Sequence, residues 1–269
     1  MSLLLSKKKP FLVLVDFGGN EGSEEALKLI EKANIPYQVI DHHPYETTNP
    51  SIFNSWKYDK TGQYTAGYLA CEIARMLNRD VESMINVGLA GDKSTIAPIT
   101  EEDREKALVI DYLTTYTNDI NFIIMMLDKP ELYQEFRAQA KQKLEEIHDL
   151  LGELEYIPIG DIKLYLINID DIIKRTEFQS SGKIASFLLE REGPDAVVIA
   201  QTRNIFVMRV GEGAYKKGVN TKKILDYFKD IGSGGGHEKA GAMRVPPKYM
   251  GYVRGEIPRL IKRMVEGAL

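Results

Sequence analysis

The feature that most constrains the fold is an alternation of short apolar runs with helix-like segments in the N-terminal half of the chain. Residues 11–15 form a continuous apolar run that ends at Asp16, and residues 37–40 form a second run that leads directly into Asp41. Buried parallel strands have this appearance because helices cover both of their faces. The segments 23–30, 65–77 and 100–112 have the capping residues and apolar spacing of helices. The alternation predicts βαβ units and therefore an open α/β sheet.

A second α/β region is predicted after a long charged segment. Residues 131–155 contain few glycines or prolines and indicate a connecting helix. Beyond this segment, residues 163–167, 196–200 and 205–208 are predicted strands, and residues 181–192 and 221–229 are predicted helices. Arg203 and Asn204 separate two apolar runs, which predicts a hairpin. We therefore expect an N-terminal parallel-sheet domain at 1–128, a connecting helix at 129–155, and a smaller C-terminal α/β domain at 156–269.

Charge and composition narrow the class of protein. The net charge is −4, but residues 1–155 carry 16 basic and 26 acidic residues, whereas residues 156–269 carry 19 and 13. This asymmetry indicates two domains with different tasks, with chance surface composition as the alternative. The chain has neither an apolar run of membrane-spanning length nor the pattern of a secretory signal. One cysteine, Cys71, excludes an internal disulfide and a cysteine zinc cluster, so we expect a cytoplasmic protein with no membrane partner.

Carboxylates and imidazoles gather where the predicted strands end. Asp16 follows the first strand, and Asp41 follows the second, with His42 and His43 directly after it. Ligands bind at the carboxyl ends of strands in open α/β sheets, and mixed oxygen and imidazole donors suit Mn²⁺ better than Ca²⁺. The alternative is an incidental surface turn. Asp92 is either a further metal ligand or a helix cap.

The other concentrated signal is a glycine-rich turn near the C-terminus. Its exposed backbone N–H groups would face an anion if a helix began there, and nearby side chains add donors. The candidate phosphate-binding residues are Gly234, Gly235, Gly236, His237, Lys239 and Arg209. The alternatives are a flexible turn for the glycines and an ordinary exposed edge-strand residue for Arg209.

These motifs together resemble the DHH phosphoesterase superfamily, in particular its RecJ-like and oligonucleotide-degrading branch. The matching segments, in family order, are Val15-Asp16-Phe17-Gly18, Asp41-His42-His43-Pro44, Ala90-Gly91-Asp92, and Gly234-Gly235-Gly236-His237 with Lys239-Ala240-Gly241. The resemblance implies that Asp16 bridges two metals and that His42 and Asp92 hold one of them. It also implies that Asp41 supports the metal shell and that His43 faces the substrate. The implied metal is Mn²⁺, with Mg²⁺ as the alternative.

One departure from the family pattern limits the prediction of catalysis. Family members begin with a strand that ends in an Asp-rich first motif, which supplies about half of the metal ligands. Met1 to Pro10 contain no Asp, Glu or His, and only these ten residues precede the first predicted strand. We therefore expect weak binding of one metal and little or no hydrolysis by this chain, since a two-metal hydrolase needs both ions.

Two functions compete at this point. The first is a RecJ-like, metal-dependent phosphodiesterase or exonuclease that acts on single-stranded DNA or RNA or on short oligonucleotides, with small phosphoesters or cyclic dinucleotides as other substrates of the same class. The second is a catalytically inactive RecJ relative that binds single-stranded DNA or a replication helicase complex. The resemblance thus implies nucleic acid, and replication or repair proteins, as classes of partner.

Overall fold

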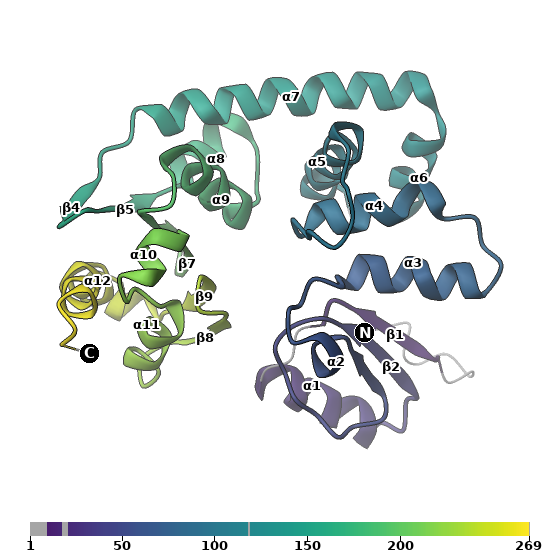
Figure 1. The fold of residues 1–269 in the computed structure, drawn as a ribbon, viewed down its shortest axis with the longest axis horizontal. Helices are drawn as coiled ribbons and strands as arrows, with labels where there is room; N and C mark the ends of the chain where they lie inside the picture. The colour runs from purple at the N-terminus through teal and green to yellow at the C-terminus, as the bar shows by residue number, and fades with distance from the viewer. Residues whose placement is uncertain (1–9, 18–20, 118, 269) are drawn as a thin grey trace. The chain divides into compact units, whose positions relative to one another are not determined.

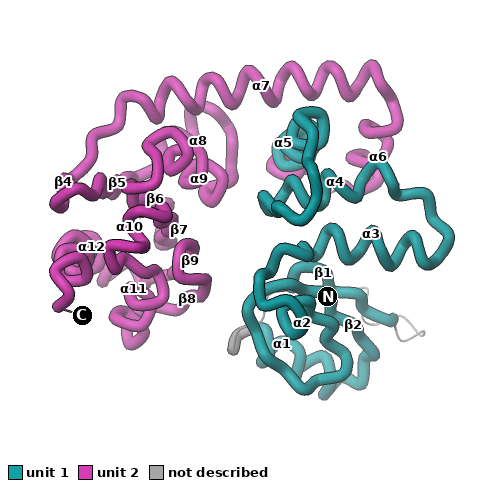
Figure 2. The backbone as a smooth tube through the Cα atoms, in the orientation of Figure 1, with its two compact units in different colours: residues 1–113 teal, residues 114–269 magenta. Residues whose placement is uncertain are grey.

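The computed structural model describes residues 10–17, 21–117 and 119–268. The chain divides into two compact units, residues 1–113 and residues 114–269 (Figure 2). The division into domains at 1–128 and 156–269 with a connecting helix stays a prediction. Residues 1–9, on which the absence of a first motif bears, lie outside the described residues, and so does Gly18.

The first unit contains a parallel sheet, as the sequence predicts. Its strands are β1 (Leu12–Val15), β2 (Tyr37–Asp41) and β3 (Ile52–Asn54), in the order β1-β2-β3 (Figure 1). Helix α1 (Glu21–Lys32) places Leu27 against Tyr37 and Val39 in a small apolar cluster. Because the strands are parallel, Asp16 and Asp41 come to the same edge of the sheet.

Four more helices follow the sheet, and two of them are packed unusually closely. They are α2 (Trp56–Asp59), α3 (Ala66–Met76), α4 (Glu82–Gly91) and α5 (Glu101–Tyr116). A Cβ atom on Gly88 would lie 2.9 Å from the carbonyl carbon of Gly67, so glycine is required where α3 meets α4. Thr65 caps α3 by accepting a hydrogen bond from the Tyr68 N–H, and its hydroxyl donates to the Gly88 carbonyl. These contacts fix the end of α4 beside the loop that precedes α3.

The second unit is built on a six-stranded mixed sheet. Its strands are β4 (Ile157–Ile159), β5 (Ile162–Asn168), β6 (Ala196–Thr202), β7 (Ile205–Val210), β8 (Ser233–Gly236) and β9 (Ala240–Arg244). Their order is β4-β5-β6-β7-β9-β8, with β5 and β6 parallel and the other neighbours antiparallel. The hairpin predicted at Arg203 and Asn204 is confirmed, and Arg203 adopts a left-handed φ of 47° at the turn.

Helices cover both faces of this sheet (Figure 1). The helices of the second unit are α6 (Ile120–Asp128), α7 (Pro130–Gly152), α8 (Asp170–Thr176), α9 (Ser181–Glu192), α10 (Glu212–Lys216), α11 (Thr221–Tyr227), the 3₁₀ helix η2 (Pro247–Tyr249) and α12 (Met250–Val265). Phe206 and Met208 of β7 pack with Ile224 of α11 and Ile257 of α12 in a fully buried core. The α/β fold class predicted from the sequence is confirmed. None of the helices in the described part of the chain is both long and apolar enough to cross a membrane.

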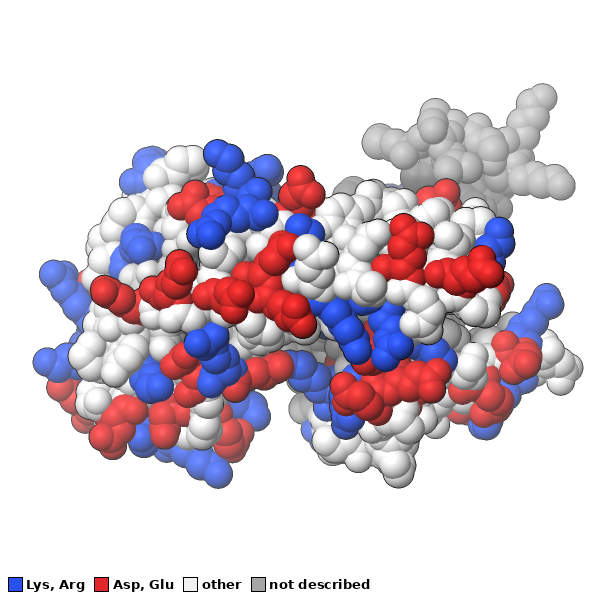
Figure 3. Space-filling view, turned by 90° about the horizontal axis from the view of Figure 1, so that it is seen from above, with Lys and Arg blue, Asp and Glu red and all other residues white. Residues whose placement is uncertain are grey.

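The difference in net charge between the two halves of the chain is smaller between the two compact units. Residues 1–113 carry 12 basic and 17 acidic residues, and residues 114–269 carry 23 and 22. The basic character predicted for the C-terminal half therefore belongs to residues 156–269, because the acidic helix α7 packs with them in the same unit. On the face seen in Figure 3, basic and acidic side chains are interspersed.

Candidate metal centre and phosphate loop

Four of the predicted site residues meet at the carboxyl ends of β1 and β2. Asp16 directly follows β1, and Asp41 ends β2, with His42 and His43 next in the chain. The Asp16 N–H donates to the Ile40 carbonyl, which holds the two strand ends together. Asp16 has a φ of 58°, a left-handed conformation that short polar residues tolerate. This conformation turns the chain out of the strand while the carboxylate stays beside the histidines.

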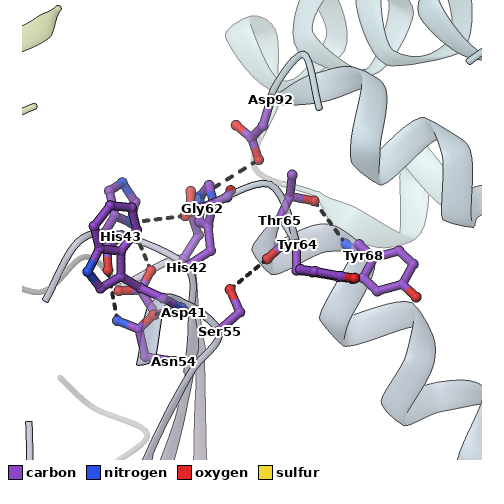
Figure 4. Close-up of polar contacts among 12 residues, drawn as sticks. Asp41, His42, His43, Asn54, Ser55, Gly62, Tyr64, Thr65, Tyr68 and Asp92 are labelled. Carbon is purple, nitrogen blue, oxygen red and sulfur yellow. Dashed lines mark hydrogen bonds and ion pairs between the residues drawn. The ribbon is translucent and has the colours of Figure 1, made fainter. Parts of the chain in front are cut away.

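The His42 ring is held by a backbone carbonyl on one side and faces carboxylates on the other. Nδ1 lies 2.8 Å from the carbonyl oxygen of Gly62 (Figure 4). Because a carbonyl only accepts, Nδ1 carries the hydrogen, and Nε2 is left with a lone pair when the ring is neutral. Nε2 lies 3.4 Å from Asp16 Oδ1 and 3.9 Å from Asp92 Oδ2. The ring therefore presents a donor atom to the space between two carboxylates.

Asp92 reaches this space from the end of α4. It occupies the C-cap position, where a negative charge is unfavourable to the helix dipole, so helix stability does not account for it. Ser94 donates a hydrogen bond from Oγ to the Gln63 carbonyl, and the Thr95 N–H donates to the Gln63 side chain. These bonds, with the close packing of α3 and α4, fix the loop of Asp92 beside the loop of Gly62.

Asp41 and His43 form a second, more buried pair. The Asp41 side chain is 1% exposed, and its Oδ1 lies 2.8 Å from His43 Nδ1. The Asn54 amide at the end of β3 donates to the His43 carbonyl at 2.9 Å. Asp41 therefore orients the His43 ring through Nδ1, while Asn54 fixes its backbone.

The protonation equilibria reflect the crowding of carboxylates around the rings. Burial opposes charge on His42, but Asp16, the Gly62 carbonyl and Asp92 outweigh it and raise the pKa of His42 to about 9. The hydrogen bond to Asp41 raises the pKa of His43, and the contact with His42 lowers the pKa of Asp16. The ring environments thus favour positive charge at this place, as a cation-binding site does.

The spacing of the donor atoms fits one divalent ion. Two donors that each lie about 2.1 Å from an ion are separated by at most about 4.2 Å. The separations of 3.4 and 3.9 Å from His42 Nε2 to the two carboxylates fall within this limit. Asp16, His42 and His43 also offer one donor atom each within 4.8 Å of one another, which is slightly wider than this limit, so His43 would have to move to share the same ion. The predicted ligands Asp16, His42 and Asp92 are thus brought together with Asp41 and His43.

The glycines of the predicted phosphate loop form a strand. Gly234, Gly235 and Gly236 lie in β8 and pair with β9, so no helix begins there to direct their N–H groups at an anion. Glycine is required at two of these positions, because a Cβ atom on Gly234 would lie 2.2 Å from the Ala242 carbonyl oxygen and one on Gly236 would lie 2.3 Å from the Ala240 carbonyl oxygen. Gly235 has open space where a side chain would be, so its backbone is accessible to a ligand. His237 follows at the turn, where its carbonyl accepts a hydrogen bond from the Thr221 hydroxyl.

The two cations of this site have different surroundings. Arg209 lies on β7, an inner strand, and not on an edge strand. Its Nε donates to Ser186 Oγ at 3.1 Å, its Nη1 donates to the Met208 carbonyl at 2.9 Å, and burial lowers the pKa of its guanidinium. Lys239 is half-exposed and pairs with Glu212 at 2.9 Å. Arg209 is thus fixed in place, whereas Lys239 is accessible.

Two residues that position the metal ligands were missed in the sequence. Gly62 holds His42, and Asn54 holds the loop of His43, although both lie apart from them in the chain. For Asn54 a signal exists, since it is a polar residue that follows an apolar pair, Ile52 and Phe53, as Asp41 follows its strand. For Gly62 the sequence offers only a glycine in a polar loop.

No family model matches the chain. Among curated proteins, the uncharacterized protein MJ1198 of Methanocaldococcus jannaschii is 23% identical over an alignment 331 positions long, gaps included, that covers 98% of this chain and 43% of that protein. The chain thus spans less than half the length of this relative.

Three solved structures are similar over almost the whole chain. The DHH domain of PF0399, described as a member of a family of ribosomal proteins, is 21% identical, with a TM-score of 0.76 over 96% of this chain and 70% of that one. RecJ of Thermus thermophilus in complex with Mn²⁺ is 14% identical, with a TM-score of 0.57 over 94% of this chain and 45% of that one. The pGpG-specific phosphodiesterase PggH of Vibrio cholerae is 10% identical, with a TM-score of 0.50 over 96% and 100%. At such low sequence identities, these similarities show that the chain shares the fold of these proteins and nothing further.

Proposed function

From the premise that this chain has the fold of the DHH phosphoesterase superfamily, we propose that it is a divalent-metal-dependent phosphodiesterase. Its substrate is single-stranded nucleic acid or a short oligonucleotide, and its ion is Mn²⁺, with Mg²⁺ as the alternative. The observation that carries the proposal is the orientation of His42, whose Nδ1 is fixed by Gly62 and whose Nε2 faces Asp16 and Asp92.

The donor set supports metal binding rather than a structural ion pair. A hydrogen bond from the non-ligating nitrogen to a carbonyl is the usual way in which proteins orient a metal-binding histidine. Asp16 and Asp92 are 54% and 45% exposed, so their carboxylates are accessible to an ion and to water. A divalent ion held here would supply Lewis-acid chemistry toward a phosphoryl oxygen.

His43 supplies the proton chemistry in this proposal. Asp41 fixes the ring through Nδ1 and raises the pKa of His43, which favours a proton on Nε2. The His43 side chain is 33% exposed, which leaves the ring accessible to a substrate. We assign to it the donation of a proton to the leaving oxygen of the phosphodiester.

The second unit supplies phosphate binding. The accessible backbone of Gly235, the fixed guanidinium of Arg209 and the accessible ammonium of Lys239 are three donors suited to phosphate oxygens. The sequence resemblance and the RecJ fold favour a nucleic-acid chain as the substrate, and PggH makes the dinucleotide pGpG a substrate to test.

We expect one ion per chain, because the described residues offer one group of metal-binding donors, around His42 Nε2 with Asp16 and Asp92 beside it. With one ion, hydrolysis is expected to be slow, since a second ion normally stabilises the leaving oxygen. Isothermal titration with Mn²⁺ measures the number of ions, and their anomalous scattering in a crystal locates them.

The activity test measures release of mononucleotides from a 5-mer DNA, a 5-mer RNA and pGpG with Mn²⁺ present. The variant His42→Ala is expected to lose both the ion and the hydrolysis. His148→Ala, on helix α7 of the second unit, is the matched control and is expected to keep both. If wild-type protein binds Mn²⁺ but hydrolyses none of these substrates above the His42→Ala background, the phosphodiesterase proposal fails, and single-strand binding without cleavage becomes the better interpretation.

A further inference from the structure

A cavity of about 450 Å³ lies in the second unit, away from the glycine-rich turn of β8 and β9. It is formed where β8 begins and β9 ends, and it includes the segment after α11 and the helix η2. The glycine-rich turn at Gly236 and His237 joins the same two strands at their other ends. The three residue steps from Ser233 to Gly236, at about 3.3 Å each, separate the two places by about 10 Å. We call this cavity the distal pocket.

The distal pocket is lined by cations that lack acidic partners. Lys229, Arg244 and Lys248 are exposed, and in the described part of the chain none of them has a carboxylate oxygen within 4 Å. Elsewhere in this unit, Lys239 pairs with Glu212, and Lys217 pairs with two aspartates. Asp230 also lines the pocket, so its side chains sum to two positive charges. Three cations that face a common space favour an anion there.

The walls of the distal pocket are held by backbone contacts. The Val245 N–H donates to the Asn204 carbonyl at 2.8 Å, and the Gly232 N–H donates to the Phe228 carbonyl at 2.9 Å. Gly232 lies so close to Met243 that a Cβ atom would be 3.0 Å from the Met243 thioether sulfur. The three cations therefore project from a fixed frame, which lowers the ordering cost of binding.

An aromatic ring adds a second kind of contact. Tyr249 lines the pocket, and Lys248 Nζ lies 4.8 Å from the centroid of its ring. Asn204 and Ser233 add an amide and a hydroxyl to the lining. Charged donors beside an aromatic face suit a phosphate ester of a nucleoside better than a carboxylate, because the ring provides a stacking surface for a base.

We propose that the distal pocket binds the phosphoryl group of a nucleotide. Two sources offer this chemistry: a backbone phosphate of a strand that also contacts the glycine-rich turn, or a free mononucleotide. The strand source rests on the function proposed above, whereas the phosphoryl site itself does not depend on hydrolysis. In the first case the pocket makes binding depend on strand length.

The direct test uses nuclear magnetic resonance of the full chain with inorganic phosphate as the probe. We expect amide shifts at residues 229–233, 244–245 and 248–249, and we expect the triple variant Lys229→Ala, Arg244→Ala, Lys248→Ala to weaken phosphate binding at least tenfold. The control removes three exposed helix cations of the same unit, Lys174→Ala, Arg259→Ala and Lys262→Ala. The proposal is overturned if these amides do not shift, or if both triple variants bind phosphate equally. A thermal melt establishes that each variant is folded.

The second measurement separates the two sources. The chain is titrated with a 12-mer single-stranded DNA and with AMP at several salt concentrations. If the source is a strand, losing the one phosphate contact of the pocket lowers the slope of log K against log salt by roughly 0.7 for the 12-mer. If the 12-mer slope is unchanged while AMP binding falls at least tenfold, the source is a free nucleotide. If the pocket variant and its control bind both the 12-mer and AMP with the same affinity and the same salt slope, a nucleotide phosphoryl group is not the ligand.

Discussion

The sheets of the two units differ in how well they are packed, and the difference bears on where the chemistry lies. The sheet of the second unit has a core of eighteen buried apolar residues, including Phe206 at 0% exposed. The described parallel sheet of the first unit packs around a cluster of three, and its strand β1 leaves Val13 57% and Val15 45% exposed. The proposed metal ligands thus lie on the less buried sheet, as is common for functional sites. We infer that the second unit stabilises itself, whereas the first gains stability from its ion.

The largest expected effect comes from the core of the second unit. Phe206→Ala should lower the free energy of unfolding by about 3–5 kcal/mol, because it removes a fully buried ring. Val13→Ala on β1 is the matched change in the first unit and should cost less than about 0.5 kcal/mol. Hydrogen exchange of peptides from β1 and from β7 reports the two units separately. If the two substitutions lowered the free energy of unfolding equally, the exposed face of β1 would have to be covered in solution.

The next effect is stabilisation by the ion, which should be confined to the first unit. Binding of Mn²⁺ at about 100 times its dissociation constant should add about 2.7 kcal/mol to the unit that holds it. Calorimetry of the wild type should show the transition of the first unit shifting upward, with the second transition unchanged. Asp92→Asn should remove most of the shift. If both transitions moved together, the two units would unfold as one cooperative body and the comparison would fail.

The third effect is a pH dependence of ion affinity. Below a pKa of about 9 the metal-free His42 carries a proton, and the ion must displace this proton to bind Nε2. The apparent Mn²⁺ affinity should therefore rise about tenfold per pH unit from pH 6.5 toward 9, or about 1.4 kcal/mol per unit. Titrations at about pH 6.5, 7.5 and 8.5, which span the interval between the two pKa values, test this slope. An affinity that is flat over this range would contradict the raised pKa of His42.

The raised pKa of His42 also affects the stability of the metal-free first unit, which should fall as pH rises, whereas the affinity for the ion should rise. A pKa raised from 6.5 to about 9 on folding means that the folded state holds the proton more tightly than the unfolded state. The resulting stability is fully present below pH 6.5 and is lost as pH rises through about 9. Without Mn²⁺ the melting temperature of the first unit should fall across this window. The second unit is the internal reference for this measurement.

The sequence indicated which proposed ligands would come together, but it did not indicate the residues that hold them in place. Asp16, Asp41, His42 and His43 could be found because each stands at a strand end that the apolar pattern marks. The role of Gly62 depends on a loop that returns to His42 only after folding. Gly234 to Gly236 gave no strand signal, since glycine has low β propensity, and pairing with β9 makes them a strand. The distal pocket was missed because its three cations are brought together by tertiary structure alone.

The smallest expected effect on stability separates binding from packing in the second unit. The ion pair between Lys239 and Glu212 is half-exposed on both sides, so Lys239→Gln should leave the melting temperature almost unchanged. If Lys239 binds phosphate, the same variant should weaken binding of a single-stranded 12-mer and lower its salt slope by about 0.7. Glu212→Gln should strengthen binding, because it frees Lys239 and removes a negative charge. If Lys239→Gln weakens binding and Glu212→Gln strengthens it, with little change in melting temperature, then Lys239 contacts the bound nucleic acid. If the two variants change the affinity in the same direction, the ion pair stabilises the local structure and Lys239 is not a phosphate ligand.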